Sequence, residues 1–164
     1  MSDAGPPQGA KVPSGGSEDA PVPTVGALVV LDTNIVLDAF VFSDAAAMPL
    51  RAALEDGALQ WIATSAMRIE LARVLGYPQI VPRLAFYALD AAVVLATFDR
   101  HVQRVEAAPK APVTCCDPDD QKFIDLAVAH QCALLSKDRA VLDLRKRLLA
   151  LGVRAGAALE ADPA

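Results

Sequence analysis

Leu28-Val29-Val30-Leu31-Asp32-Thr33-Asn34 is the stretch that decides the predicted fold. Its apolar run is too short for a helix and follows the turn signal Gly26, which is typical of a strand buried on both faces. Ligands of open parallel sheets bind beyond the carboxyl ends of the strands, so Asp32 lies where chemistry is expected. On this stretch alone, however, capping the next helix is the commoner role of such polar residues, and other acids must decide between the two interpretations.

The composition indicates one acidic, soluble domain with a tail. The chain has 164 residues, a hydrophobic content of 54% and a net charge of -5, which argues against a nucleic-acid-binding module that depends on lysine and arginine alone. Cys115, Cys116 and Cys132 have no paired metal-ligand spacing and indicate reduced thiols in a cytoplasmic protein. We find no apolar run of membrane-spanning length and no signal pattern, and therefore expect no membrane association.

The chain divides into three parts. Residues 1–26 are rich in proline and glycine and poor in large apolar side chains, which predicts a disordered tail. Residues 27–156 alternate apolar runs with helical patterns, as expected for βαβ units around a parallel sheet. Residues 157–164 are predicted to form a short C-terminal tail.

Turn signals and hydrophobic periodicity predict the elements of the main domain. We expect one long helix from Pro82 to the prolines at 109 and 112, with Arg83 on its solvated face. Strands are predicted at 28–31, 59–63, 113–116 and 133–136, with an edge strand after Val153. Further helices are predicted at 35–42, 48–56, 65–75 and 117–130, and one more after 137–139.

Acidic residues stand at several of these element ends. Asp32 and Asp138 each follow a strand, Asp117 and Asp120 open a helix, and Glu70 lies within a helix. Each has an ordinary explanation as a cap, a partner of the helix dipole or a surface charge. Together they form a pattern, because strand ends of a parallel sheet and the helices that begin there face one edge. We therefore expect these carboxylates to converge.

A converging acidic cluster needs cations. Two unit charges 4 Å apart repel by about 4 kcal/mol at an effective dielectric constant near 20. Mg²⁺ and Mn²⁺ take oxygen ligands and resolve this repulsion. Such a site suits phosphodiester hydrolysis, because a bound metal lowers the pKa of an attacking water and a second can stabilise the leaving oxygen. The cations also allow an acidic protein to hold a polyanion.

Four motifs in chain order carry a family resemblance. Over residues 27–150 the chain resembles the PIN-domain nucleases, and within them it is most similar to bacterial toxins of type II toxin-antitoxin systems. The motifs are Leu31-Asp32-Thr33-Asn34, Arg68-Ile69-Glu70-Leu71, Asp117-Pro118-Asp119-Asp120 and Leu135-Ser136-Lys137-Asp138-Arg139.

This resemblance implies a fold and an activity. The fold is a three-layer α/β/α sandwich with a central parallel sheet. The activity is that of an endoribonuclease that uses one or two Mg²⁺ or Mn²⁺ ions, with RNA as substrate, a cognate antitoxin as partner and a homodimeric state. By resemblance, the catalytic and metal-binding acids are Asp32, Glu70, Asp120 and Asp138, with Asp117 as a further metal ligand and Thr33, Asn34 and Ser136 as supporting polar residues.

Two other functions are kept beside this one. The first is a catalytically inactive PIN-like module that acts through a protein partner. The second is a phosphoryl-transfer domain with Asp32 as nucleophile, which is less favoured because Asn34 replaces the second aspartate of a D-x-D motif. Of the remaining residues, Trp61 is expected in the core, and Lys122 and Lys137 are expected to balance the charge of nearby acids.

Overall fold

The computed structural model describes residues 27–159, so the predicted tail at 1–26 and most of the one at 157–164 lie outside the described residues. A five-stranded sheet in the order β3-β2-β1-β4-β5 forms the centre, and all its strand pairs are parallel. The helices of the described part are too short or too polar to cross a membrane. The strands are β1 (Ala27–Leu31), β2 (Leu59–Ala63), β3 (Val102–Arg104), β4 (Ala133–Leu135) and β5 (Ala155–Gly156).

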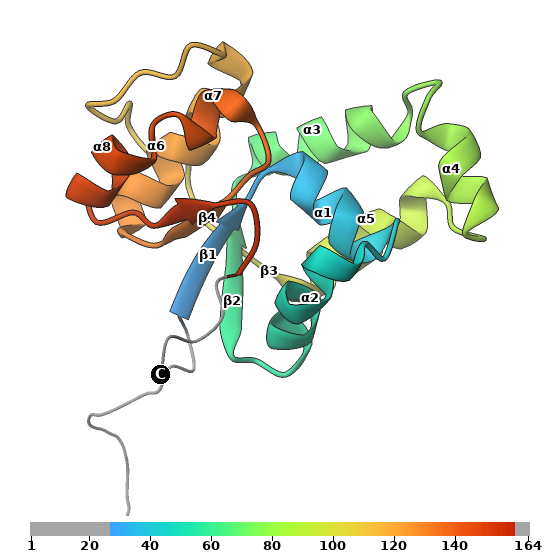
Figure 1. Ribbon diagram of the computed structural model, residues 1–164. Helices are drawn as coiled ribbons and strands as arrows, with labels where there is room; N and C mark the ends of the chain where they lie inside the picture. The colour runs from blue at the N-terminus through green and yellow to red at the C-terminus, as the bar shows by residue number, and fades with distance from the viewer. Residues whose placement is uncertain (1–26, 160–164) are drawn as a thin grey trace, which may run out of the picture.

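Helices cover both faces of the sheet, with α1 to α5 on one side and α6 to α8 on the other (Figure 1). The predicted three-layer α/β/α sandwich is therefore confirmed. The α-helices are α1 (Thr33–Phe40), α2 (Met48–Glu55), α3 (Ser65–Leu75), α4 (Val81–Phe86), α5 (Ala91–His101), α6 (Gln121–His130), α7 (Arg139–Leu142) and α8 (Arg145–Ala150). Two 3-10 turns, η1 (Ala45–Ala47) and η2 (Pro118–Asp120), precede α2 and α6.

The core forms around the central strand β1. Val29 and Val30 are completely buried, as expected for a strand with helices on both faces. On the neighbouring strand β2, Trp61 is 1% exposed and meets the ring of Phe98 edge-on at 5.1 Å. The predicted core position of this tryptophan is confirmed.

The prediction of one long helix after Pro82 is wrong. The chain leaves α4 after Phe86, and Ala88 adopts a left-handed conformation with φ 57°. Asp90 then starts α5 by accepting a hydrogen bond from the Val93 N–H at 2.9 Å. Helix α5 ends at His101, and the edge strand β3 follows directly where helix was expected.

The predicted strand at residues 113–116 is also wrong, because a side chain binds its backbone instead of a neighbouring strand. The Gln121 amide accepts from the Cys115 N–H at 2.7 Å and donates to the Val113 carbonyl at 2.9 Å. The single helix expected after residue 139 is divided into α7 and α8, whereas the edge strand expected after Val153 is present as β5.

The sheet places one crevice at the carboxyl ends of β1 and β4. The connections from β1 through β2 to β3 lie on one face, and the helices that precede and follow β4 lie on the other, so the order reverses between β1 and β4. The Asp32 N–H donates to the Leu135 carbonyl at 2.9 Å, which extends the pairing one residue beyond β1. Asp32 and Ser136 consequently lie side by side at the crevice.

Candidate active site

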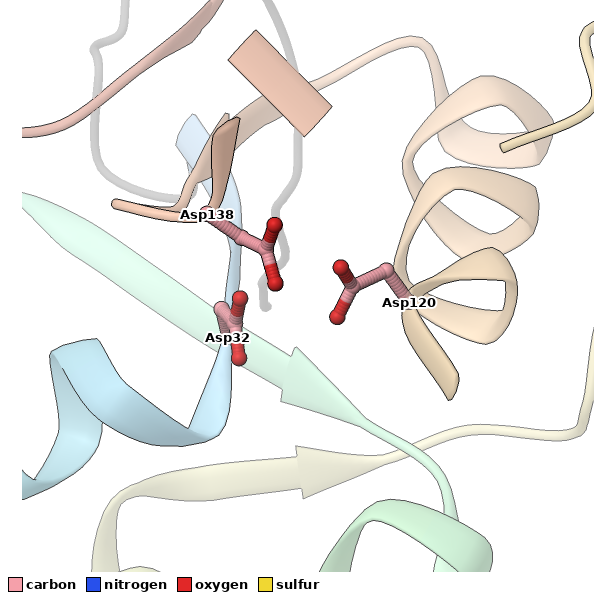
Figure 2. Close-up of side chains that lie close together, drawn as sticks. All are labelled: Asp32, Asp120 and Asp138. Carbon is pink, nitrogen blue, oxygen red and sulfur yellow. The ribbon is translucent and has the colours of Figure 1, made fainter. Parts of the chain in front are cut away.

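Three aspartates from distant parts of the chain meet at this crevice. Asp32 follows β1, Asp120 stands at the start of α6, and Asp138 follows β4. Each offers a carboxylate oxygen, and these oxygens all lie within 4.8 Å of one another. Figure 2 shows the three carboxylates turned toward a common point. We call these residues the aspartate trio.

The geometry separates the helix-cap interpretation from the functional one. Asp32 and Asp120 occupy the N-cap positions of α1 and α6, but neither side chain makes a capping hydrogen bond. Asp138 does cap α7, because its Oδ1 accepts from the Ala140 N–H at 2.9 Å. Capping therefore accounts for Asp138 but not for Asp120. The Asp32 carboxylate is held by a hydrogen bond from Ser136 and by its interaction with the Asn34 backbone.

Ser136 connects two members of the trio. Its hydroxyl donates to Asp32 Oδ2 at 2.7 Å and accepts from the Asp138 N–H at 3.0 Å. The side chain is completely buried, so no water competes for these bonds. This geometry suits the supporting role expected of Ser136, since a hydrogen-bonded carboxylate keeps its orientation.

Glu70 lies beside the trio and is engaged by two other residues. Thr33 Oγ1 donates to Glu70 Oε2 at 2.6 Å, and Lys122 Nζ lies 2.5 Å from Glu70 Oε1. The charge of Glu70 is close enough to raise the pKa of Asp32. Lys122 was expected to balance the charge of a nearby acid, but no local pattern identifies its partner Glu70, which lies on another helix.

The other two expected site residues face different surroundings. The Asp117 side chain accepts from the Asp119 N–H at 3.0 Å and so caps η2, while its charge contributes to the raised pKa of Asp120. Asn34 is exposed, and its side chain lines a neighbouring cavity together with Arg83 and other residues. Arg83 was expected on a solvated face, and in the structure it lines this cavity.

No ion pair between described side chains balances the negative charge of the trio. Burial raises the pKa of Asp120 to about 8, and the adjoining carboxyl group of Asp138 and the charge of Asp32 act in the same direction. Burial also raises the pKa of Asp32, which the hydrogen bond from Ser136 opposes.

One atom shows that these residues fit a cation. Asp120 Oδ2 is buried and has no hydrogen-bond partner among the described residues. A buried polar atom without a partner costs roughly 1–3 kcal/mol. A cation at the point where the three carboxylates converge removes this cost, and a donor set made only of carboxylate oxygens matches hard divalent ions such as Mg²⁺ and Mn²⁺.

Comparisons with known proteins agree with this architecture. No curated protein sequence matches the chain significantly. Among solved structures, a chain in the crystal structure of VapBC2 from Rickettsia felis bound to a DNA fragment from their promoter has a similar fold. The two align with a TM-score of 0.52 and 13% identity over 78% of this chain and 98% of the other. The family model of the PIN domain matches residues 28–140, which is more than half of the sequence and includes every expected acidic site residue. The chain therefore belongs to the PIN-domain family.

Proposed function

We propose that the protein is a metal-dependent endoribonuclease that hydrolyses RNA phosphodiester bonds. The observation that carries this proposal is the aspartate trio, in which three carboxylates lie within 4.8 Å of one another and take part in none of the ion pairs between described side chains. Its position at the carboxyl ends of β1 and β4, in a chain of the PIN-domain family, supports the same conclusion.

Asp32, Asp120 and Asp138 would hold one or two Mg²⁺ or Mn²⁺ ions, with Asp117 and Glu70 as further acidic groups of the site. When bound, such an ion supplies Lewis-acid chemistry, which lowers the pKa of an attacking water and stabilises charge on the leaving oxygen.

The polar neighbours of these acids keep the carboxylates in place. Ser136 fixes the orientation of Asp32, and Thr33 and Lys122 fix that of Glu70. The ammonium group of Lys122 also adds a positive charge beside the acids, which favours an anionic substrate. Asp32, Glu70, Asp120 and Asp138 form the proposed catalytic set.

We further propose that the protein acts as the toxin of a type II toxin-antitoxin pair in the cytoplasm, with a protein antitoxin as partner and a homodimeric state. The resemblance of the four acidic motifs to such toxins supports this, as does the likeness of fold to VapBC2. If the proposal is right, induced expression arrests bacterial growth and the Asp32→Asn variant does not. Equal growth inhibition by both proteins would contradict a toxic nuclease activity.

Cleavage of single-stranded RNA by the purified full chain tests the enzymatic proposal. We expect cleavage with Mn²⁺ or Mg²⁺, none with excess chelator, and a loss of more than about a hundredfold in Asp32→Asn, since even mutations of supporting residues at metal sites cost roughly 10–100-fold. Asp143→Asn is the matched control, because Asp143 is exposed and paired with Arg139. Cleavage that survives both chelator and Asp32→Asn rules the mechanism out. Calorimetry that detects no divalent-ion binding favours the inactive binding module instead.

A further inference from the structure

A cavity of about 510 Å³ opens beside the aspartate trio. Residues from α1, α4 and the segment after β4 line it, among them Asn34, Arg83, Tyr87 and Lys137. None of the three aspartates lines the cavity, but two lining residues are close to them along the chain. Asn34 lies two residues after Asp32 and Lys137 directly precedes Asp138, and consecutive Cα atoms are about 3.8 Å apart. A molecule held at the trio can therefore extend into this space, and its volume is in the range of small-ligand sites.

Arg83 and Tyr87 present unpaired polar groups to the cavity. They are four residues apart at the end of α4 and so share one side of the helix. The Arg83 guanidinium lies over the Phe42 ring at 3.6 Å from its centroid, and no described carboxylate pairs with it. The Tyr87 ring lies 6.2 Å from the Phe42 ring and is 39% exposed. The Phe42 ring thus contacts both the Arg83 guanidinium and the Tyr87 ring.

Of the other charged residues of the lining, Lys137 and Asp38 pair with each other, whereas Asp44 is hydrogen-bonded but keeps its negative charge. Lys137 forms an ion pair with Asp38 at 2.5 Å, and Asp44 accepts a hydrogen bond from the Ala46 N–H at 3.0 Å. The side-chain amide of Asn34 makes no hydrogen bond to a described residue, so its donor and acceptor are available. The cavity offers one planar cation, one aromatic ring, one amide and the carboxylate of Asp44. The cation and the ring suit a ligand with a single phosphate and a planar ring, and the amide and the carboxylate can bond polar groups on the ring edge.

We propose that this cavity is a nucleotide subsite of the RNA-cleaving centre, in which Tyr87 stacks on a base, Arg83 donates to the adjacent phosphate and Asn34 bonds the base edge. The inference rests on the proposed function. Unstacked RNA bases bind aromatic and guanidinium planes and are recognised by hydrogen bonds at their edges. The flat guanidinium also matches the geometry of a phosphate group. Such a subsite would let an acidic protein bind its polyanionic substrate at one place on its surface.

Two readouts with matched controls test the subsite. Short single-stranded RNA is titrated against the full chain by fluorescence anisotropy in Ca²⁺, and cleavage is measured in Mn²⁺ to separate kcat from KM. The test variants are Tyr87→Ala, Tyr87→Phe and Arg83→Gln. The controls are Tyr77→Ala and Arg73→Gln, since Tyr77 is 36% exposed, Arg73 is exposed, and neither lines the cavity.

We expect Tyr87→Ala to weaken RNA binding and raise KM by about tenfold with little change in kcat, because stacking on an aromatic ring accounts for such a factor. Tyr87→Phe keeps the ring and should bind like the native chain. Arg83→Gln should weaken binding and reduce the slope of log affinity against log salt by about 0.7, the value for one phosphate contact to a single strand. Both controls should match the native chain.

Equal RNA affinity in the native, Tyr87→Ala and Arg83→Gln proteins overturns the subsite, and this is also the result expected if the cavity receives a protein segment instead. The two proposals fail separately. If the native chain cleaves RNA but its KM is insensitive to Tyr87→Ala, the subsite alone is wrong. If no RNA is cleaved but affinity still depends on Tyr87 and Arg83, the nuclease proposal fails, and the cavity is an RNA-binding site without a cleaving centre beside it.

Discussion

The aspartate trio and a second charged cluster differ in whether their acidic side chains are paired with cations. In the second cluster, Asp99 of α5 accepts from Arg68 at 2.8 Å through each of its carboxylate oxygens and lies 3.5 Å from Arg104 of β3. Its pKa is lowered, mainly by the hydrogen bonds from Arg68. In the trio, burial and neighbouring acids raise the pKa of Asp120 to about 8. Both clusters join three elements, yet in one the acid is paired with two arginines, and in the other none of the three acids takes part in an ion pair between described side chains.

This difference in charge pairing indicates which of the two clusters is functional. Exposed clusters in which each acid is ion-paired, such as that of Asp99, contribute little to stability and need no ligand to neutralise the acid. A buried cluster of like charges opposes folding until a ligand neutralises it, and strongly perturbed carboxylates of this kind concentrate at functional sites. Three predictions test whether the two clusters really differ in this way.

The largest expected effect is stabilisation by a divalent cation. A ligand that binds only the folded state at 100 times its Kd stabilises it by about 2.7 kcal/mol. Thermal denaturation of the full chain with and without Mn²⁺ should show this as a Tm increase of several degrees. Asp120→Asn should abolish the increase, whereas Asp99→Asn should keep it. An equal Mn²⁺ effect in both variants would remove the distinction between the clusters.

The second prediction concerns pH in the presence of chelator. Because the pKa of Asp120 is raised from 3.8 to about 8, the folded state binds more protons than the unfolded state between these values. Stability from this group is therefore fully present at low pH and is lost as pH rises toward and through 8. Urea midpoints should fall from about pH 5.5 to about pH 9, and Asp120→Asn should reduce the fall. A midpoint that rises over this interval would contradict the raised pKa.

The smallest effect is expected at Asp99. Its lowered pKa has the opposite consequence, because the stability that it contributes is present above its ordinary pKa of 3.8 and is lost as the pH falls. Since the pair is exposed, Asp99→Asn should shift Tm by about 2 °C or less near neutral pH, and added salt should reduce the shift further. RNA cleavage should be unchanged. A large loss of cleavage would mean that this cluster also belongs to the active site.

Much of the fold follows from local sequence patterns. Apolar runs such as Leu28-Val29-Val30-Leu31 predict buried strands, and the polar residues after them mark the functional edge of the sheet. The break between α4 and α5 was not predictable from residue 88, because Ala88 takes a left-handed conformation that glycine, asparagine and aspartate favour and alanine does not. Strand β3 was missed because two of its three residues, Gln103 and Arg104, are polar and exposed.

The candidate site was predictable in part. The positions of Asp32, Asp120 and Asp138 at element ends predict that they face one edge, and in the structure their oxygens meet. The Lys122 to Glu70 ion pair was not predictable, because it depends on how α6 and α3 are turned toward each other. Asn34 and Arg83 line the same cavity, and this depends likewise on the position of α4, which was predicted to form one long helix with α5.

The single hydroxyl of Ser136 has a consequence for ion selectivity. It bonds Asp32 on one side and the backbone of Asp138 on the other, across 104 positions of sequence. The spacing between these two aspartates is therefore set by the sheet when the chain folds. Since Mg²⁺ demands shorter and more regular oxygen contacts than Ca²⁺, we expect such a frame to discriminate between ions by size if the proposed metal site is right. Ser136→Ala should relax that discrimination while leaving all the carboxylates in the chain.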